Sequence, residues 1–121
     1  MAQTVRVTVD NKIEVLDIPW SLDEWEKAIG AECTEKVHTH IMASLFRDSI
    51  VMIVDESGII KHRPVNRLAS ELYGVKAHGN WIHGDVLFAK WRGPDIYPLE
   101  NAEIVKFFLK DNFPYLEEVE K

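Results

Sequence analysis

Apolar and polar residues alternate near the start of the chain, which is the pattern of strands that bury one face. The alternation covers residues 5–9 and resumes over 13–18, with Asp10-Asn11 between the two segments. Asp and Asn favour tight turns, so the two segments are predicted to pair as a hairpin. A continuous, mostly β-branched run over 50–54 predicts a central strand that is covered on both faces.

Three weaker signals predict the rest of the sheet. Alternation over 37–41 predicts a strand, and the sequence D-E-S-G at 55–58 predicts a tight turn. A return strand is expected to begin at Ile59-Ile60. The last strand is expected over 81–91, followed by a break at Gly93-Pro94.

Helical spacing of apolar residues predicts three helices, over 22–29, 64–73 and 99–112. The first follows Ser21, with Glu24 three residues later as in a capping box. Pro64 is expected to open the second helix, because proline is tolerated in a first helical turn, and Gly74 to end it.

The predicted core draws on most of these elements. The third helix is expected to bury Ile104, Val105 and Phe108, with Phe107 as a further candidate. The residues expected to surround one core are Trp25, Val51, Ile53, Leu68, Leu72, Val86, Phe88 and Phe108. The predicted fold class is α+β, with an antiparallel or mixed sheet of about five strands and three short helices mainly on one face. Residues 1–113 are predicted to form this single domain, and 114–121 a flexible acidic tail.

Composition narrows the classes of function. The 121 residues include 20 acidic and 14 basic side chains, a formal net charge of −6. General nucleic-acid-binding proteins present basic faces, so this class is disfavoured. The single cysteine, Cys33, cannot form an internal disulfide. We see no signal peptide and no apolar run long enough to span a bilayer. We therefore expect a cytoplasmic protein that is not attached to a membrane.

His38 and His40 form the strongest metal-binding pattern, because two residues apart on a strand they would share a face. The residues that could complete a ligand set are Cys33, His62, His78 and His83. Against this, histidines are common on exposed strands, and no second paired motif accompanies these two. We expect no metal and no cofactor, and keep His38 and His40 as the alternative site.

A cluster of cations where the second helix is expected to begin is the main candidate site. Lys61, Arg63 and Arg67 lie there with Asn66, in a chain whose overall charge is negative. Free N–H groups at a helix start attract anions. We predict that these four residues bind a phosphate of a nucleotide-like ligand or carboxylates of a partner. The alternative is that Asn66 only shapes the helix start and Arg67 pairs with Glu71.

Trp81 and Trp91 flank the last predicted strand and are candidates for stacking on a base or another ring. The alternative is that they form edges of the core. Catalytic signals are poor, because Cys33 has no flanking pattern, no serine lies in G-x-S-x-G, and no glycine-rich phosphate loop precedes a helix.

The order of the motifs resembles that of one protein family. The motifs are V-D-E-S-G at 54–58, P-V-N-R-L-A at 64–69 and I-H-G-D-V-L-F at 82–88. From Val5 to Asn112 the chain resembles domain of unknown function family 3846, in which D/N-E-x-G, P-x-N-R-x-A and I-x-G-x-x-x-V/F occur in this order. The chain departs from the family at Gly30-Ala31 and Ala89-Lys90, where the family has further glycines.

The resemblance implies an accessory protein of a phage, plasmid or conjugative element, and it assigns no catalytic residue. We therefore expect a non-enzymatic binding protein that acts on a host protein or sequesters a small anionic nucleotide-like ligand, with anti-defence as a candidate role. We also expect a homodimer formed through an open sheet edge. The alternative is a small metal-dependent enzyme that uses the histidines.

Overall fold

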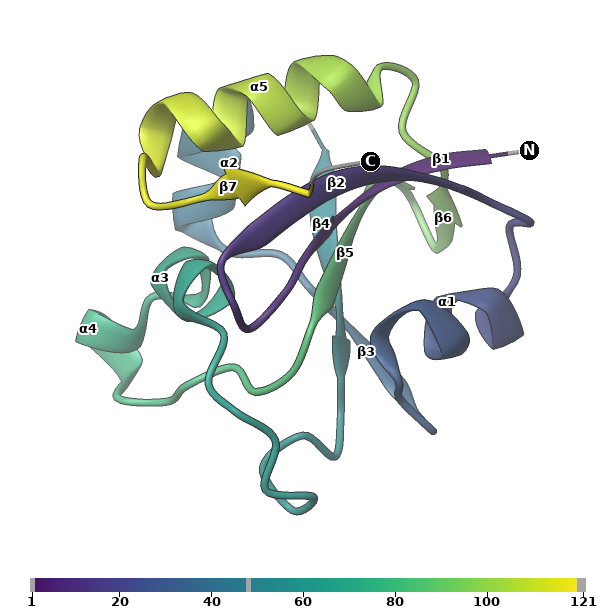
Figure 1. The fold of residues 1–121 in the computed structure, drawn as a ribbon. Helices are drawn as coiled ribbons and strands as arrows, with labels where there is room; N and C mark the ends of the chain where they lie inside the picture. Colours follow the sequence, from purple (N-terminus) through teal and green to yellow (C-terminus); the bar gives the residue numbers. More distant parts are fainter. Residues whose placement is uncertain (1, 48, 120–121) are drawn as a thin grey trace.

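The computed structural model describes residues 2–47 and 49–119 and shows an α+β fold built on one mixed sheet (Figure 1). The strand order is β3-β4-β5-β1-β2-β7, and β6 extends the sheet beside β5. The strands are β1 (Ala2–Val7), β2 (Lys12–Ile18), β3 (Thr34–Val37), β4 (Ile50–Asp55), β5 (Val86–Arg92), β6 (Asp95–Tyr97) and β7 (Glu117–Glu118). The helices are α1 (Leu22–Ile29), α2 (His40–Phe46), α3 (Arg67–Tyr73), α4 (Val75–His78) and α5 (Ala102–Asn112).

The sheet separates two apolar clusters, so the predicted core residues do not surround one core. α2, α3 and α5 cover one face, and α1 lies on the other (Figure 1). Leu68, Leu72 and Phe88 are buried on the first face. Val51 and Ile53 point to the second, because neighbouring residues of a strand face opposite sides. None of the described helices is long and apolar enough to cross a membrane.

β4 is the central strand that the sequence predicts, and all six of its residues are buried. It pairs with β3 on one edge and with β5 on the other. Because both edges are occupied, the predicted return strand at Ile59-Ile60 is wrong. Successive turns carry the chain from 56 to 63, and Ile59 and Ile60 are exposed.

The first predicted helix is confirmed as α1, with Ser21 accepting a hydrogen bond from the Glu24 N–H and with Gly30 in the left-handed region. The predicted helix start at Pro64 is wrong. α3 begins at Arg67 because Asn66, not proline, caps it. Val65 instead forms an isolated bridge with His83.

The predicted strand over 37–41 is correct only at its first residue. β3 ends at Val37, and Thr39 caps α2 by accepting a hydrogen bond from the Met42 N–H at 3.2 Å. The Thr39 hydroxyl also donates to the Leu72 carbonyl at 2.7 Å. Threonine suits both a strand and a cap, so alternation alone did not reveal α2.

The last predicted strand is shorter than expected, and a second short strand follows it. β5 begins at Val86, because Gly84 with φ +94° turns the chain just before it. The Gly93 turn then leads into β6, which the sequence did not predict. The loop predicted over 75–80 contains the short helix α4.

Burial along α5 differs from the prediction. Ala102 and Leu109 are its buried residues, and Val105 and Phe108 are half-buried. Ile104 is 63% exposed and Phe107 is 73% exposed. This helix therefore carries more apolar residues than the sheet covers.

The predicted flexible tail is instead attached to the domain as far as the structure describes it. Leu116 is buried, and β7 pairs in parallel with β2. Glu117 forms an ion pair with Lys12 at 2.6 Å. Glu118 pairs with Lys106 at 2.5 Å and with Lys110 at 2.8 Å. The negative charges that suggested a solvated tail are thus paired with cations of β2 and α5.

Attachment of β7 should depend on pH. Hydrogen bonds from Lys106 and Lys110 lower the pKa of Glu118 from 4.5 to about 2. A depressed pKa stabilises the folded form above the unfolded value, and this contribution is lost as the pH falls from 4.5 towards 2. Hydrogen exchange should show the amides of Glu117 and Val119 losing protection over this range before those of β4. Glu118→Gln should loosen β7 at neutral pH, and equal protection of both strands at low pH would contradict the prediction.

Candidate functional site

The predicted anion site is divided, because its cations pair with acidic residues of the domain itself. Nε of Arg63 lies 2.9 Å from Oδ2 of Asp55, whose side chain is fully buried. Nζ of Lys61 lies 3.5 Å from the same oxygen. The Arg63 guanidinium also donates a hydrogen bond to the Gly30 carbonyl, at the end of α1. Arg63 therefore joins α1 to the end of β4.

Two glycines leave room for the Arg63 side chain. A Cβ atom on Gly30 would lie 3.2 Å from a terminal nitrogen of the guanidinium. A Cβ atom on Gly84 would lie 3.1 Å from Cδ of Arg63. Both glycines also have positive φ angles, which side chains rarely adopt. The backbone around Arg63 is thus shaped to enclose it.

Asn66 is fully buried, and its side chain is used by the fold. Oδ1 accepts a hydrogen bond from the Ala69 N–H at 3.1 Å, which caps α3. Nδ2 donates to the carbonyls of Val7 and Gly84, each at 3.0 Å. These contacts join α3, β1 and the segment before β5. Asn66 is therefore not available to a ligand, in contrast to the prediction.

Arg67 points to a different part of the surface. It pairs with Glu71 at 3.7 Å, as the alternative interpretation predicted, and its guanidinium carbon lies 3.7 Å from the centre of the Tyr115 ring. Tyr115 donates a hydrogen bond to Glu71. Burial, reinforced by this bond, raises the pKa of Tyr115. The group attaches the segment after α5 to α3.

The structure separates the histidines proposed as metal ligands. β3 ends before His38, and His40 is the first residue of α2, so they do not share a strand face. The His38 ring lies 5.0 Å from the ring of Trp91, centre to centre. Within residues 2–47 and 49–119 no three His, Cys, Asp or Glu residues gather in a way that could hold a metal ion. The side chain of His78 lies outside the described residues.

Trp81 lies beside a hollow of about 200 Å³, here called the Trp81 hollow. Its wall includes Trp81, which is 51% exposed, and Tyr73 of α3. Two exposed carboxylates, Glu35 of β3 and Glu56 after β4, also line it. The remaining lining residues are Val37, Val54, Asp55, Ile59, Asn80, Ile82 and His83. The hollow therefore combines aromatic rings with negative charge at the β3 edge of the sheet.

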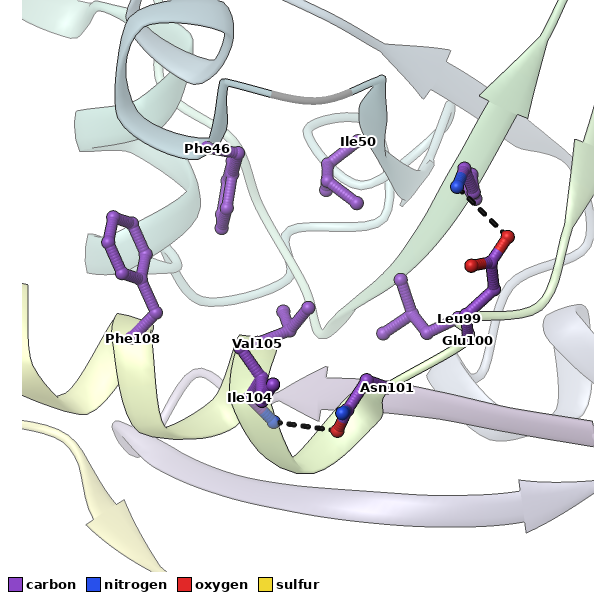
Figure 2. Close-up of a pocket in the computed structure, with 9 residues that line it drawn as sticks. Phe46, Ile50, Leu99, Glu100, Asn101, Ile104, Val105 and Phe108 are labelled. Carbon is purple, nitrogen blue, oxygen red and sulfur yellow. Dashed lines mark hydrogen bonds and ion pairs between the residues drawn. The ribbon is translucent and has the colours of Figure 1, made fainter.

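A second cavity of about 250 Å³, here called the α5 cleft, opens between α5, the end of α2 at Phe46 and the start of β4 at Ile50. Figure 2 shows Phe46, Ile50, Val105 and Phe108 arranged around it. Its rim is polar. Glu100 pairs with Lys90 at 3.0 Å, and Asn101 caps α5 by accepting from the Ile104 N–H at 3.3 Å (Figure 2). The remaining lining residues are Leu99 and Ile104.

A family model matches nearly the whole of this structure. The family is described as Domain of unknown function (DUF3846), and its model matches residues 2–110. The chain belongs to this family. Comparisons with curated proteins and with solved structures give no match.

The three motifs that carry the resemblance to DUF3846 meet in one place. Gly58, from the first motif, lies so close to the third that an added Cβ atom would be 2.5 Å from the His83 carbonyl oxygen. Asn66, from the second, donates to Gly84 of the third. Arg63 reaches Asp55 between them. In this DUF3846 domain the motif residues hold the fold together, and the open surfaces lie beside them.

Sequence reasoning identified Trp81 but missed its neighbours in the hollow. Glu35, Glu56 and Tyr73 come from three elements, and their meeting depends on strand pairing that periodicity does not reveal. The exposure of Ile104 and Phe107 was also missed. The sequence did contain a signal for this exposure, because α5 has more apolar residues than one face of a helix can bury against the sheet.

Proposed function

We propose that this DUF3846 protein is a non-enzymatic binding protein of a phage or other mobile element, and that it acts on a host protein. The observation that carries the proposal is the Trp81 hollow beside the open edge of β3. The mobile-element origin rests on the family resemblance. Anti-defence is one role that such a protein would fill.

The chemistry of the hollow suits a cationic side chain of the partner. An arginine guanidinium can stack on the ring of Trp81 and pair with Glu35 or Glu56. The net charge of −6 would also draw a basic segment towards this protein. A nucleotide phosphate is a less suitable ligand for the hollow, because it is negatively charged and these carboxylates would repel it.

The edge of β3 supports the capture of an extended segment. In the described part of the chain β3 is the end strand of the sheet and pairs only with β4. An added strand would hydrogen-bond to the free edge of β3, as in β-augmentation. Alternate side chains of that strand would lie on the face that carries Glu35 and Val37, next to the hollow.

A photo-crosslinking experiment in host cells tests the proposal. A benzoylphenylalanine at Ile59, an exposed residue of the hollow, should capture one host protein, and the same group at Trp91 should not. Trp81→Ala should reduce capture from position 59 by about 5- to 30-fold, because stacking on a guanidinium contributes roughly 1–2 kcal/mol. Trp91→Ala is the matched control and should leave capture unchanged.

The melting temperature separates lost binding from lost folding. Trp81 is half exposed, so its replacement should shift the melting temperature by only a few degrees. Equal capture from positions 59 and 91, or full capture by Trp81→Ala, would contradict the proposal. A nucleotide-like molecule retained in native mass spectrometry without any protein partner would favour the alternative of ligand sequestration.

A further inference from the structure

We infer that the host partner adds a strand to β3 in which a basic and an acidic residue are adjacent. The basic side chain enters the Trp81 hollow, and the acidic side chain pairs with Lys36 on the opposite face of the sheet. This rests on the proposed function and defines the bound segment of the partner by its sequence pattern. Two features of β3 carry it, the direction of its backbone groups and the charges on its two faces.

The pairing of β3 with β4 fixes which backbone groups of β3 point to its neighbour. The Glu56 N–H donates to the Cys33 carbonyl at 3.1 Å, and the strand register extended by one residue places these two residues opposite each other. They therefore form a hydrogen-bonded pair of the antiparallel ladder. Such pairs recur at every second residue, so Glu35 and Val37 also direct their N–H and C=O groups to β4.

The residues between them present their backbone groups to the open edge. Thr34 and Lys36 direct their N–H and C=O groups away from β4, and β3 is the end strand in the described part of the chain. An added strand forms its hydrogen bonds with these groups. Its position beside β3 is therefore set by Thr34 and Lys36.

The side chains of β3 divide between two faces of opposite charge. Glu35 lies on the face of the Trp81 hollow, where Glu56 adds a second carboxylate. Lys36 points to the other face, because neighbouring residues of a strand alternate. The Asp55 carboxylate on that face already has two cations beside it. Glu35 and Lys36 are exposed, and among the described residues neither forms an ion pair.

These charges select the order of side chains in the added strand. Opposed residues of neighbouring strands point to the same face. An arginine opposite Glu35 can therefore pair with it and stack on Trp81, whereas the next residue, opposite Lys36, lies on the other face and pairs as Asp or Glu. The order holds for a parallel or an antiparallel strand, because side chains alternate in both. The reverse order would place like charges opposite each other, which is destabilising.

The sequence predicted a homodimer through an open sheet edge, but a second copy is a poor occupant of this one. Two β3 strands related by a two-fold axis pair antiparallel. One register places Glu35 opposite its own copy, and the neighbouring register places Lys36 opposite its own copy. Like charges directly opposite each other are destabilising. The charges of β3 therefore favour a partner of different sequence.

Two synthetic peptides of equal composition test the inference, with amide hydrogen exchange of the full chain as the measurement. In one peptide arginine and glutamate alternate between valine and threonine flanks, so a strand carries each charge on its own face. In the other the arginines precede the glutamates, so each face carries both charges. The alternating peptide should bind at least about 3-fold more tightly and protect the amides of Thr34 and Lys36. These amides should exchange rapidly in the chain alone, and those of Glu35 and Val37 slowly.

Equal affinity of the two peptides, or no binding of either at millimolar concentration, would overturn the inference. Protection that appears only outside β3 would do the same. Protection of Thr34 and Lys36 in the chain alone at high concentration would show that a second copy occupies the edge, and would also overturn it.

Variants at Lys36 separate the backbone from the charge. Lys36→Pro removes an N–H that points away from β4, a position where edge strands tolerate proline, and should abolish protection of Thr34 by the alternating peptide. Lys36→Gln is the matched control, because it keeps the N–H, and should still bind with a smaller preference for the alternating order. Lys36→Glu keeps every backbone group and should remove the preference. A folded Lys36→Glu variant with the full preference would contradict the inference.

Capture of a host protein from position 59 reports on the proposed function separately. Continued capture together with equal binding of the two peptides would overturn the sequence pattern alone. A clear preference for the alternating peptide without any captured host protein would contradict the proposed function instead.

Discussion

Replacing Asn66 with alanine should lower the free energy of unfolding by about 3–7 kcal/mol. The change removes the cap of α3, which is typically worth about 1 kcal/mol. It also leaves the carbonyls of Val7 and Gly84 without their buried amide donor, at about 1–3 kcal/mol for each unsatisfied group. Urea unfolding followed by circular dichroism would measure the loss. Asn66→Ser should recover only the part due to the cap.

Asn101 provides a matched control for this prediction. Its side chain caps α5 with the same kind of hydrogen bond, since Oδ1 accepts from the N–H three residues on, that of Ile104, at 3.3 Å. Asn101 is exposed, so Asn101→Ala should cost only about 1 kcal/mol. Similar losses for the two variants would show that the buried amide contacts of Asn66 contribute little, and would contradict the prediction.

Local sequence patterns were sufficient where one interaction decides the structure. Ser21 and Gly30 set the ends of α1 through the cap and the left-handed turn that their residue types favour. The β-branched run over 50–54 predicted β4, because a strand covered on both faces needs apolar residues at every position. The class of the fold and its family were therefore accessible from sequence alone.

The failures occurred where tertiary contacts override a local pattern. Ile59-Ile60 has strong strand propensity, but β5 already occupies the edge of β4 that it would need. Thr39 continues an alternating pattern, but its hydroxyl is used as a cap and as a donor to Leu72. Glu117 and Glu118 are charged like a solvated tail, but lysines distant in sequence pair with them.

The site predicted from the sequence contained a cluster of cations but not the acidic residues of the domain that these cations contact. The cluster of cations is real, and the sequence placed Lys61 and Arg63 together correctly. The sequence did not reveal Asp55 as their common partner. The turns after β4 bring Lys61 and Arg63 back beside the carboxylate of Asp55, and no local pattern predicts this contact. The exposed charged groups beside Trp81 are the carboxylates of Glu35 and Glu56, so this surface is negative rather than positive. This reversal is why a cationic partner replaces the anion in the proposed function.

Arg63 should prove essential to the fold rather than to binding. Arg63→Ala should lower the free energy of unfolding by about 2–4 kcal/mol, because it leaves the buried Asp55 carboxylate with Lys61 as its remaining cation. This value is below that of a fully buried pair, since the Arg63 side chain is 31% exposed and water screens part of the interaction. Arg63→Lys should be intermediate, because it keeps a charge but loses the planar group that also bonds Gly30.

Arg67→Ala is the control, because Arg67 is also a predicted site residue but its side chain is 58% exposed. Loss of its contacts with Glu71 and the Tyr115 ring should lower the free energy of unfolding by about 1 kcal/mol. A double-mutant cycle with Asp55→Asn tests the cause, because that change should cost less in the Arg63→Ala background than in the wild type. Additive losses would show that Arg63 acts without Asp55. Arg63→Ala with an unchanged melting temperature and lost partner capture would return Arg63 to the binding site.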